Sequence, residues 1–205
     1  MNYPYTNHPI ILKAINLVAQ LHEHQYRKAT TNVRDGTPYV AHPYAVFCIL
    51  VHFYPDGDKN LFLGGLLHDV LEDVNPAIYN EEKMRKDFGD RVTDIVKELS
   101  EDKDGTMRKA EKIETWRKRK EDYLAHLHSV SNEALYICAA DKIHNTYEII
   151  RSFEEHGNII WNSFNSSKEQ TIWYYGEVHK TLSERISYEP IVKELSRKVK
   201  KLTAL

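Results

Sequence analysis

The chain has 205 residues, enough for one substantial hydrophobic core, and its formal net charge of −2 argues against a general nucleic-acid binder. Hydrophobic residues make up 41% of the chain and charged residues 28%, while 8 Gly and 7 Pro are few enough to favour helices over turn-rich sheets. The polar start does not resemble a secretory signal, and no apolar run approaches the roughly 20 residues that span a bilayer. We therefore expect a cytoplasmic protein with two buried thiols and with no membrane or DNA partner.

Apolar residues recur at helical spacing along the chain, and no stretch shows the alternation that is typical of β-strands. Asn80 and Ser131 are residue types that favour helix N-caps, and Gly89 is suited to a helix end. The fold class predicted from this pattern is all-α. The predicted helices cover the first residues to about Arg27, Pro43–Tyr54, Gly65–Val74, a short helix after Asn80, Asp90–Leu99, Arg108–His128, a helix after Ser131, and two helices between about Trp161 and Leu205 that are separated near Tyr188–Pro190.

The segment Gly65–Val74 places four polar residues in an otherwise apolar stretch that reads GLLHDVLEDV. In one continuous helix, residues three and four apart share a face, so His68, Asp69, Glu72 and Asp73 could face the same space. A buried polar group without a partner costs roughly 2–7 kcal/mol. A metal ion is the obvious partner for one imidazole and three carboxylates.

Two more polar residues lie in predicted helices with apolar neighbours. His42 stands at the start of the second predicted helix, and Asp141 follows a run of apolar residues after Ser131. Together with His68 and Asp69 they supply two imidazoles and two carboxylates. Such a mixed nitrogen and oxygen set suits Mn²⁺, Fe²⁺ or Zn²⁺ and leaves room for water or substrate at the ion.

Four short segments between residues 26 and 145 together carry a family resemblance. They are Tyr26-Arg27-Lys28, Thr37-Pro-Tyr-Val-Ala-His42-Pro43, Leu67-His68-Asp69-Val-Leu-Glu72-Asp73 and Ala140-Asp141-Lys142-Ile143-His144-Asn145. In content and order they resemble the motifs of the HD-domain metal-dependent phosphohydrolases, and in particular the RelA/SpoT-type (p)ppGpp hydrolase domain and its small stand-alone relatives. The resemblance implies an HD-domain helical bundle with additional C-terminal helices. Residues 1–150 would form the phosphohydrolase core, and residues 151–205 would form an extension packed on it within a single domain.

The resemblance also implies roles for individual residues. His42, His68, Asp69 and Asp141 would bind one Mn²⁺, with Fe²⁺ or Zn²⁺ as alternatives. Glu72 and Asp73 would orient or deprotonate the attacking water, as a carboxylate near a metal-bound water can do. Arg27, Lys28 and Asn145 would bind a small-molecule nucleotide, with Arg27 against the nucleobase.

Two features depart from the (p)ppGpp hydrolase pattern. Cys138 stands three residues before Asp141, where those enzymes usually carry lysine, and the segment between Glu101 and Asp141 is longer than in those enzymes. Trp116–Lys120 in that segment and the later Trp173–Tyr175 instead resemble a sister group of stand-alone bacterial HD phosphohydrolases. The basic run near residue 118 fits a solvated helix face or a phosphate-attracting one equally well.

Three functions therefore stay open. The favoured one is a (p)ppGpp 3′-pyrophosphohydrolase that releases pyrophosphate. The second is an HD phosphohydrolase of another nucleotide or phosphorylated cofactor. The third is a non-catalytic, metal-bound regulatory or antitoxin-like module.

Overall fold

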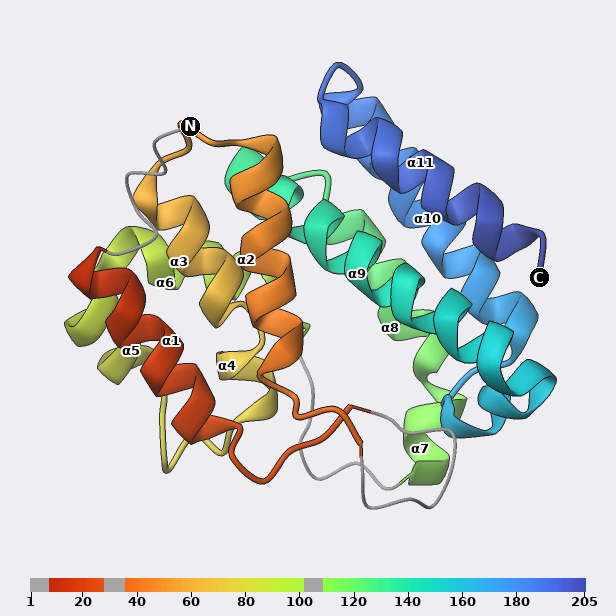
Figure 1. Ribbon diagram of the computed structural model, residues 1–205, viewed down its shortest axis with the longest axis horizontal. Helices are drawn as coiled ribbons and strands as arrows, with labels where there is room; N and C mark the ends of the chain where they lie inside the picture. Colours follow the sequence, from red (N-terminus) through yellow and green to blue (C-terminus); the bar gives the residue numbers. More distant parts are fainter. Residues whose placement is uncertain (1–7, 28–35, 102–108) are drawn as a thin grey trace.

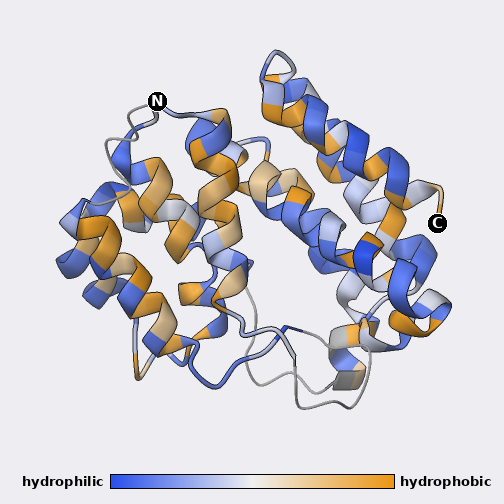
Figure 2. Cartoon of the chain, in the orientation of Figure 1, coloured by the Kyte–Doolittle hydropathy of each residue, from blue (hydrophilic) through white to orange (hydrophobic). Residues whose placement is uncertain are grey.

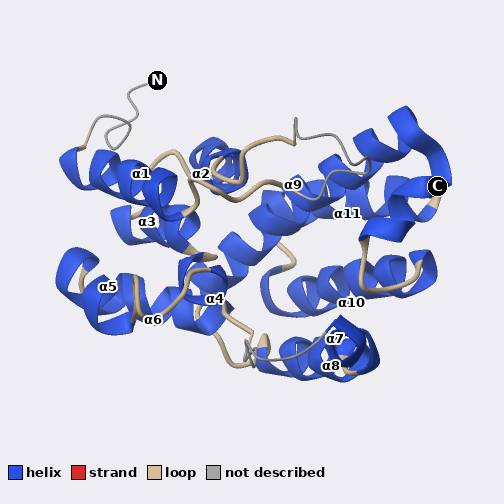
Figure 3. Ribbon diagram, turned by 90° about the horizontal axis from the view of Figure 1, so that it is seen from below, coloured by secondary structure: helices blue, strands red, loops and turns tan. Residues whose placement is uncertain are grey.

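The computed structural model describes residues 8–27, 36–101 and 109–205, and in these ranges it contains helices and no strand beyond one isolated β-bridge between Tyr26 and Pro38 (Figure 3). The all-α prediction is confirmed. The helices are α1 (Pro9–Leu21), α2 (Ala41–Phe53), α3 (Lys59–Leu67), α4 (Val70–Asp73), α5 (Glu81–Phe88), α6 (Asp90–Leu99), α7 (Lys109–Glu114), α8 (Trp116–His126), α9 (Asn132–His156), the 3₁₀-helix η1 (Gly157–Ser163), α10 (Lys168–Ile186) and α11 (Pro190–Thr203).

The long helix α9 runs through the middle of the molecule (Figure 1). It packs against α2, α3 and α6 on one side and against α10 and α11 on the other. Helix α1 packs on α3, α5 packs on α6, and α8 packs on α10. The buried hydrophobic side chains of these helices form one continuous core, so α9 holds the two sides together.

Local interactions begin and end several helices where the sequence predicts. The side chain of Asn80 accepts a hydrogen bond from the Lys83 amide at 3.1 Å, and Ser131 Oγ accepts one from the Ala134 amide at 3.3 Å. Each contact satisfies an amide that the first turn of a helix leaves without a main-chain partner. Gly89 separates α5 from α6 with a φ of +88°, a conformation that is strained for residues with a side chain.

The first helix ends earlier than predicted. It stops at Leu21, a turn follows at residues 22–24, and Tyr26 then forms the isolated bridge to Pro38. The Arg27 amide donates to the Thr37 carbonyl at 2.9 Å, and the Tyr39 amide donates to the Gln25 carbonyl at 2.9 Å. These two main-chain bonds replace helical ones, and they bring Arg27 next to the residues that precede α2.

The prediction of one continuous helix over Gly65–Val74 is wrong. Helix α3 ends at Leu67 and α4 begins at Val70, so His68 and Asp69 lie at a break between two helices. His68 Nδ1 lies 2.8 Å from the Gly65 carbonyl oxygen, the acceptor that a continuous helix would pair with the amide of Asp69. The His68 side chain thus takes the carbonyl oxygen that the Asp69 amide would bond in a continuous helix.

Two other helix boundaries also differ from the prediction. The helix predicted from Arg108 is two helices that meet at Thr115, whose hydroxyl donates to the Glu111 carbonyl at 2.7 Å, a contact that bends helices. Arg108 itself lies outside the described residues. Trp161 belongs to η1, and α10 begins only at Lys168, where Ser167 and Gln170 form a capping box.

Hydropathy follows the packing. Hydrophobic residues dominate α2 and α3, whereas α11 carries polar residues along much of its length (Figure 2). The buried residues of α11 are Ile191, Val192, Leu195, Val199 and Leu202, which recur at helical spacing. Among the helices that the structure describes, none is both long enough and apolar enough to cross a membrane.

Candidate metal centre and cavity

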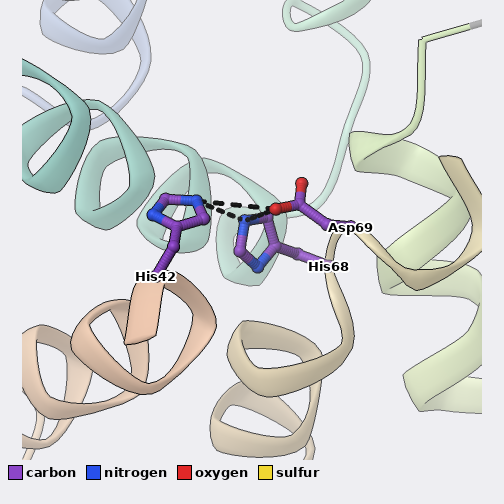
Figure 4. A group of neighbouring side chains, drawn as sticks. All are labelled: His42, His68 and Asp69. Atoms are coloured by element: carbon purple, nitrogen blue, oxygen red, sulfur yellow. Dashed lines mark hydrogen bonds and ion pairs between the residues drawn. The ribbon is translucent and has the colours of Figure 1, made fainter. Parts of the chain in front are cut away.

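Three side chains from two segments meet beside α9 (Figure 4). His42 lies in the first turn of α2, and His68 and Asp69 lie at the break between α3 and α4. The Nε2 atoms of the two imidazoles are 3.3 Å apart, and Asp69 Oδ2 lies 3.5 Å from His42 Nε2 and 3.2 Å from His68 Nε2. Ligands about 2.1 Å from one ion at angles between about 90° and tetrahedral lie about 3.0–3.4 Å apart. With separations of 3.2–3.5 Å, the three ligand atoms lie close to the spacing of a divalent ion's coordination shell.

The contact to Gly65 orients His68 for metal binding. A carbonyl oxygen only accepts, so His68 Nδ1 carries a hydrogen and donates it to Gly65 at 2.8 Å. In the neutral ring this leaves a lone pair on Nε2, the atom that faces the cluster. Burial lowers the pKa of His68, but Asp69, Asp141 and the Gly65 carbonyl outweigh it and raise the pKa to about 9. An incoming metal ion must therefore displace a proton there.

A second histidine supports His42 from behind. His42 Nδ1 lies 2.8 Å from Nδ1 of His144, one turn of α9 after Ala140. If Nε2 of His42 is the ligand atom, its Nδ1 carries the hydrogen and donates to His144. Burial lowers the pKa of both rings, and it combines with the neighbouring His42 to bring the pKa of His144 to about 4. The His42 imidazole is therefore suited to the neutral state that ligation requires, and a neutral His144 can accept its hydrogen bond.

Asp141 approaches this three-residue cluster from α9, next to His42. Its Oδ1 lies 3.1 Å from His42 Nε2, and its Oδ2 pairs with Lys142 Nζ at 2.5 Å. Burial would raise the pKa of Asp141, but Lys142 and His42 outweigh it and hold this pKa well below its usual range. Asp141 is therefore a carboxylate at neutral pH, although it is buried.

Arg27 and Asn145 are connected to this carboxylate. Arg27 Nη2 donates to Asn145 Oδ1 at 2.6 Å, and Asn145 Nδ2 donates to Asp141 Oδ1 at 2.5 Å. The Arg27 guanidinium also lies 5.8 Å from the centre of the Tyr39 ring. Residues 118 positions apart thus belong to one network. Lys28, which we predict as a third substrate-binding residue, lies outside the described residues.

Tyr39 links the metal cluster to one of the two predicted water-handling residues. Its hydroxyl lies 2.6 Å from Asp69 Oδ2 and 2.9 Å from Asp73 Oδ2. Burial, reinforced by the charge of Asp69, raises the pKa of Asp73 above its usual value. The other predicted residue, Glu72, accepts a hydrogen bond from the Glu101 amide at 3.1 Å.

The cluster opens into a cavity of about 720 Å³, within the range of about 300–1,000 Å³ that is typical of small-molecule sites. Every predicted site residue that the structure describes lines this cavity: Arg27, His42, His68, Asp69, Glu72, Asp73, Asp141 and Asn145. Other residues that line the cavity include Trp116, Lys120, Cys138, Lys142 and Tyr174. The cavity is thus lined by the candidate metal cluster, by further carboxylates that include Glu72 and Asp73, and by several cations.

The basic run on α8 is paired with other groups. Lys118 pairs with Asp122 at 2.5 Å, and Arg117 lies 3.2 Å from the centre of the Trp173 ring while its Nε donates to Glu121. Arg119 and Lys120 both contact Glu101. Of these four cations, only Lys120 lines the cavity among the described residues. Most of the run is therefore a solvated or packed helix face.

We did not predict Tyr39, His144 or Glu101 as site residues, although each contacts a residue that we did predict. Tyr39 and His144 stand three residues from His42 and from Asp141, inside the quoted motifs, so their proximity along the chain was a usable signal. The sequence around Glu101 contains no comparable signal, because its contacts are with residues 29 and 18 positions away.

Comparisons with known proteins agree with this geometry. A family model described as an HD domain matches residues 14–168. A Xenopus tropicalis protein named guanosine-3′,5′-bis(diphosphate) 3′-pyrophosphohydrolase MESH1 is 34% identical over 146 residues, which cover 71% of this chain and 73% of that protein. The solved structure of lmo0812 from Listeria monocytogenes EGD-e superposes with a TM-score of 0.62 at 25% identity, over 80% of this chain and 95% of that one.

A further solved structure, described as a metazoan ortholog of SpoT that hydrolyzes ppGpp, superposes with a TM-score of 0.68. It covers 98% of this chain and 96% of that chain at 22% identity, a level at which the similarity is one of fold. The arrangement of α1–α11 is therefore shared with known structures over nearly the whole chain.

Proposed function

This chain belongs to the HD-domain family, and from that premise we propose that it is a metal-dependent phosphohydrolase that removes the 3′-diphosphate from (p)ppGpp. Its products would be GDP or GTP and pyrophosphate. The observation that carries the proposal is that one cavity of about 720 Å³ is lined by the cluster of His42, His68 and Asp69, by Asp141 next to His42, and by Glu72 and Asp73. The relative that is named for this reaction shares 34% identity with the chain.

We propose Mn²⁺ as the ion, held by His42, His68, Asp69 and Asp141, with Fe²⁺ or Zn²⁺ as alternatives. Two imidazole nitrogens and two carboxylates are an acceptable donor set for all three ions. When bound, a divalent ion lowers the pKa of its water toward neutrality and offsets charge on a phosphoryl oxygen.

Glu72 and Asp73 supply the proton acceptors. In the proposed reaction a water oxygen forms a bond to the phosphorus next to the ribose, and the bond between that phosphorus and the 3′-oxygen breaks. One proton of the water passes to the carboxylate of Glu72 or Asp73, and the carboxyl group so formed gives this proton to the 3′-oxygen, which leaves as a hydroxyl group. The raised pKa of Asp73, caused by burial and by Asp69, brings it closer to the range in which a general base works best.

Arg27 and Asn145 would bind the nucleotide, with Lys28 beside them. The guanidinium of Arg27 is planar and lines the cavity, so it can stack on a base or donate to a phosphate. Its hydrogen bond to Asn145 holds it at the side of the cavity that Asp141 closes.

A second candidate function is the hydrolysis of another nucleotide or phosphorylated cofactor. Cys138 favours it, because this buried residue lines the cavity where the (p)ppGpp hydrolases usually carry a lysine. The Cys138 thiol contacts the Tyr123 hydroxyl at 3.8 Å, and burial raises the pKa of this thiol. A neutral group at this position gives less attraction to phosphate than an ammonium would.

The test is to load metal-free protein with Mn²⁺, Fe²⁺ or Zn²⁺ and to measure pyrophosphate and GDP released from ppGpp. A parallel panel should contain other nucleotides and cofactors with 2′- or 3′-phosphates. Asp69→Asn should lower both the bound metal and the turnover, the latter by at least about 100-fold.

The outcomes separate the candidates. Pyrophosphate release from ppGpp above that from the rest of the panel supports the first function, and preferred release from another compound supports the second. Metal-loaded, folded protein that hydrolyses nothing in the panel rules out both and leaves the non-catalytic regulatory module.

A further inference from the structure

Glu101 is a largely buried acidic residue two positions after the end of α6, and two cations of α8 hold its side chain. Arg119 Nη1 lies 3.2 Å from Glu101 Oε2, and Lys120 Nζ pairs with Glu101 Oε1. The exposed fractions of the three side chains are 10% for Glu101, 17% for Arg119 and 16% for Lys120. Ion pairs this buried are screened little by water, and removing one partner leaves an uncompensated charge. Residue 101 is therefore firmly tied to α8.

The main chain of the same residue contacts Glu72. The Glu101 amide donates to Glu72 Oε2 at 3.1 Å, and both residues line the cavity that contains the metal cluster. A hydrogen bond from an amide to a carboxylate is stronger than one between neutral groups, and it restricts the orientation of the acceptor. One residue thus connects the basic helix α8 with a predicted water-handling carboxylate.

The position of this amide is fixed from two sides. On the side of α6, the amide and hydroxyl of Ser100 both bond to the Val96 carbonyl, at 3.1 and 2.9 Å. On the side of α8, Lys120 Nζ lies 4.7 Å from the centre of the Tyr174 ring, which anchors the cation that holds Glu101. Two anchors on neighbouring residues leave the Glu101 amide little freedom to turn away from Glu72.

We propose that Glu101 is a positioning residue, which through its ion pairs with Arg119 and Lys120 holds its own amide against Glu72 and thereby sets the orientation of that carboxylate in the cavity. The inference rests on the proposed function, because it assigns Glu72 a part in the reaction. It also explains how part of the basic run of α8 acts at the site: Arg119 acts through Glu101.

The experiment compares Glu101→Gln with Glu101→Asp and with a matched control, Asp122→Asn. Asp122 forms an ion pair with Lys118 on the same helix, but the two side chains are 59% and 75% exposed. With the nucleotide that the wild type hydrolyses best, Glu101→Gln should lower kcat about 10-fold and change KM less than about 2-fold, because misorientation of a catalytic group slows the chemical step. Glu101→Asp keeps the charge and should retain more of kcat, and Asp122→Asn should match the wild type.

A second measurement needs no substrate. Amide hydrogen exchange at residue 101, corrected for the intrinsic rate of each residue type, should become about 10-fold faster in Glu101→Gln and stay unchanged in Asp122→Asn. Arg119→Gln provides an independent variant in case Glu101→Gln does not fold, since Arg119 is not among the described residues that line the cavity. Like Glu101→Gln, Arg119→Gln should lower kcat and make amide exchange at residue 101 faster.

A folded Glu101→Gln protein, or failing that a folded Arg119→Gln protein, that keeps wild-type kcat or wild-type protection of the residue 101 amide overturns the inference. A fall in kcat of the Asp122→Asn control equal to that of Glu101→Gln would also overturn it, because the effect would then belong to α8 in general. If the wild type hydrolyses no nucleotide, the proposed function fails. The exchange measurement then decides by itself whether Glu101 holds Glu72.

Discussion

At the scale of single residues, the hydroxyl of Tyr39 has one hydrogen and two carboxylate neighbours. It lies 2.6 Å from Asp69 Oδ2 and 2.9 Å from Asp73 Oδ2, so it can donate to only one of them at a time. Asp69 belongs to the candidate metal cluster and Asp73 is a predicted proton acceptor. The phenol therefore keeps the two carboxylates at a fixed separation, and neighbours of this kind usually tune a metal site.

Tyr39→Phe should weaken the site without unfolding it. The ring can remain stacked on His22, 4.8 Å away, while the two carboxylates lose the one hydroxyl hydrogen that either of them can accept. We expect metal affinity or kcat to fall about 10–100-fold. Titration calorimetry with Mn²⁺ and steady-state kinetics would measure the two quantities. Wild-type values for both would show that the hydroxyl has no role in the site.

At the scale of elements, the break between α3 and α4 determines the geometry of the cluster. Helix α3 packs closely on α2 because Gly65 allows it. A Cβ at this position would lie 2.4 Å from Leu50 Cδ1, closer than packed atoms approach. The close packing brings the segments that carry His42 and His68 near enough for the two Nε2 atoms to lie 3.3 Å apart.

Gly65→Ala should therefore destabilise the protein by about 1–3 kcal/mol through overpacking. The matched control is Gly176→Ala in α10, where a Cβ would meet no atom within 4 Å. The control should stabilise the protein by up to about 1 kcal/mol, because alanine favours helices more than glycine does. Urea unfolding measures both changes. Equal effects of the two substitutions would show that α2 and α3 can separate freely.

A surface ion pair connects α1 with α5 and should make stability depend on pH. Lys13 Nζ lies 2.7 Å from Asp87 Oδ1, and this hydrogen bond, with one from Tyr79, lowers the pKa of Asp87. A lowered pKa in the folded state stabilises the protein above the unfolded value of about 3.9, and the gain is lost as the pH falls through the folded value.

Asp87→Asn should cost about 0.5–1 kcal/mol of unfolding free energy at pH 7 and nothing once both pKa values have been passed on acidification. Urea titrations of the two proteins between pH 7 and pH 2 would show the difference shrinking. If the difference in unfolding free energy between the two proteins stays constant with pH, the ionised Asp87 carboxylate does not supply the stabilisation.

At the scale of the whole molecule, α9 carries Asp141 and Asn145 and also supports α10 and α11. The C-terminal helices are attached to the other side by a carboxylate at the start of α11. Glu189 accepts hydrogen bonds from Tyr54 at 3.1 Å and from Tyr136 at 3.2 Å, and the two rings stack 4.5 Å apart. The division into a core of residues 1–150 and an extension of 151–205 stays a prediction.

Glu189→Ala should lower the unfolding free energy by about 1.5–3 kcal/mol, the usual range for hydrogen bonds to a charged group. Glu184→Ala, an exposed substitution on α10, is the control and should stay within about 0.5 kcal/mol of the wild type. Urea unfolding of the two variants gives the comparison. A loss of unfolding free energy in the control as large as in Glu189→Ala would show that the Glu189 hydrogen bonds do not attach α11 specifically.

The sequence by itself determined the all-α class, the membership in the HD family and most helix positions, because these depend on local periodicity, caps and short motifs. Helix boundaries such as those around Asn80, Gly89 and Ser131 follow from interactions between residues a few positions apart. The candidate residues were also recognisable, since buried histidines and aspartates in apolar helices require partners.

Only the tertiary structure decided which of these residues meet. It replaced the continuous helix over Gly65–Val74 with a break, because the His68 side chain bonds to the Gly65 carbonyl. It also brought Tyr39 to Asp73, His144 to His42 and Glu101 to Glu72. The link from Glu101 to Glu72 joins residues 29 positions apart, and its geometry depends on how α4, α6 and α8 pack. Packing of this kind is a property of the folded chain that no local pattern encodes.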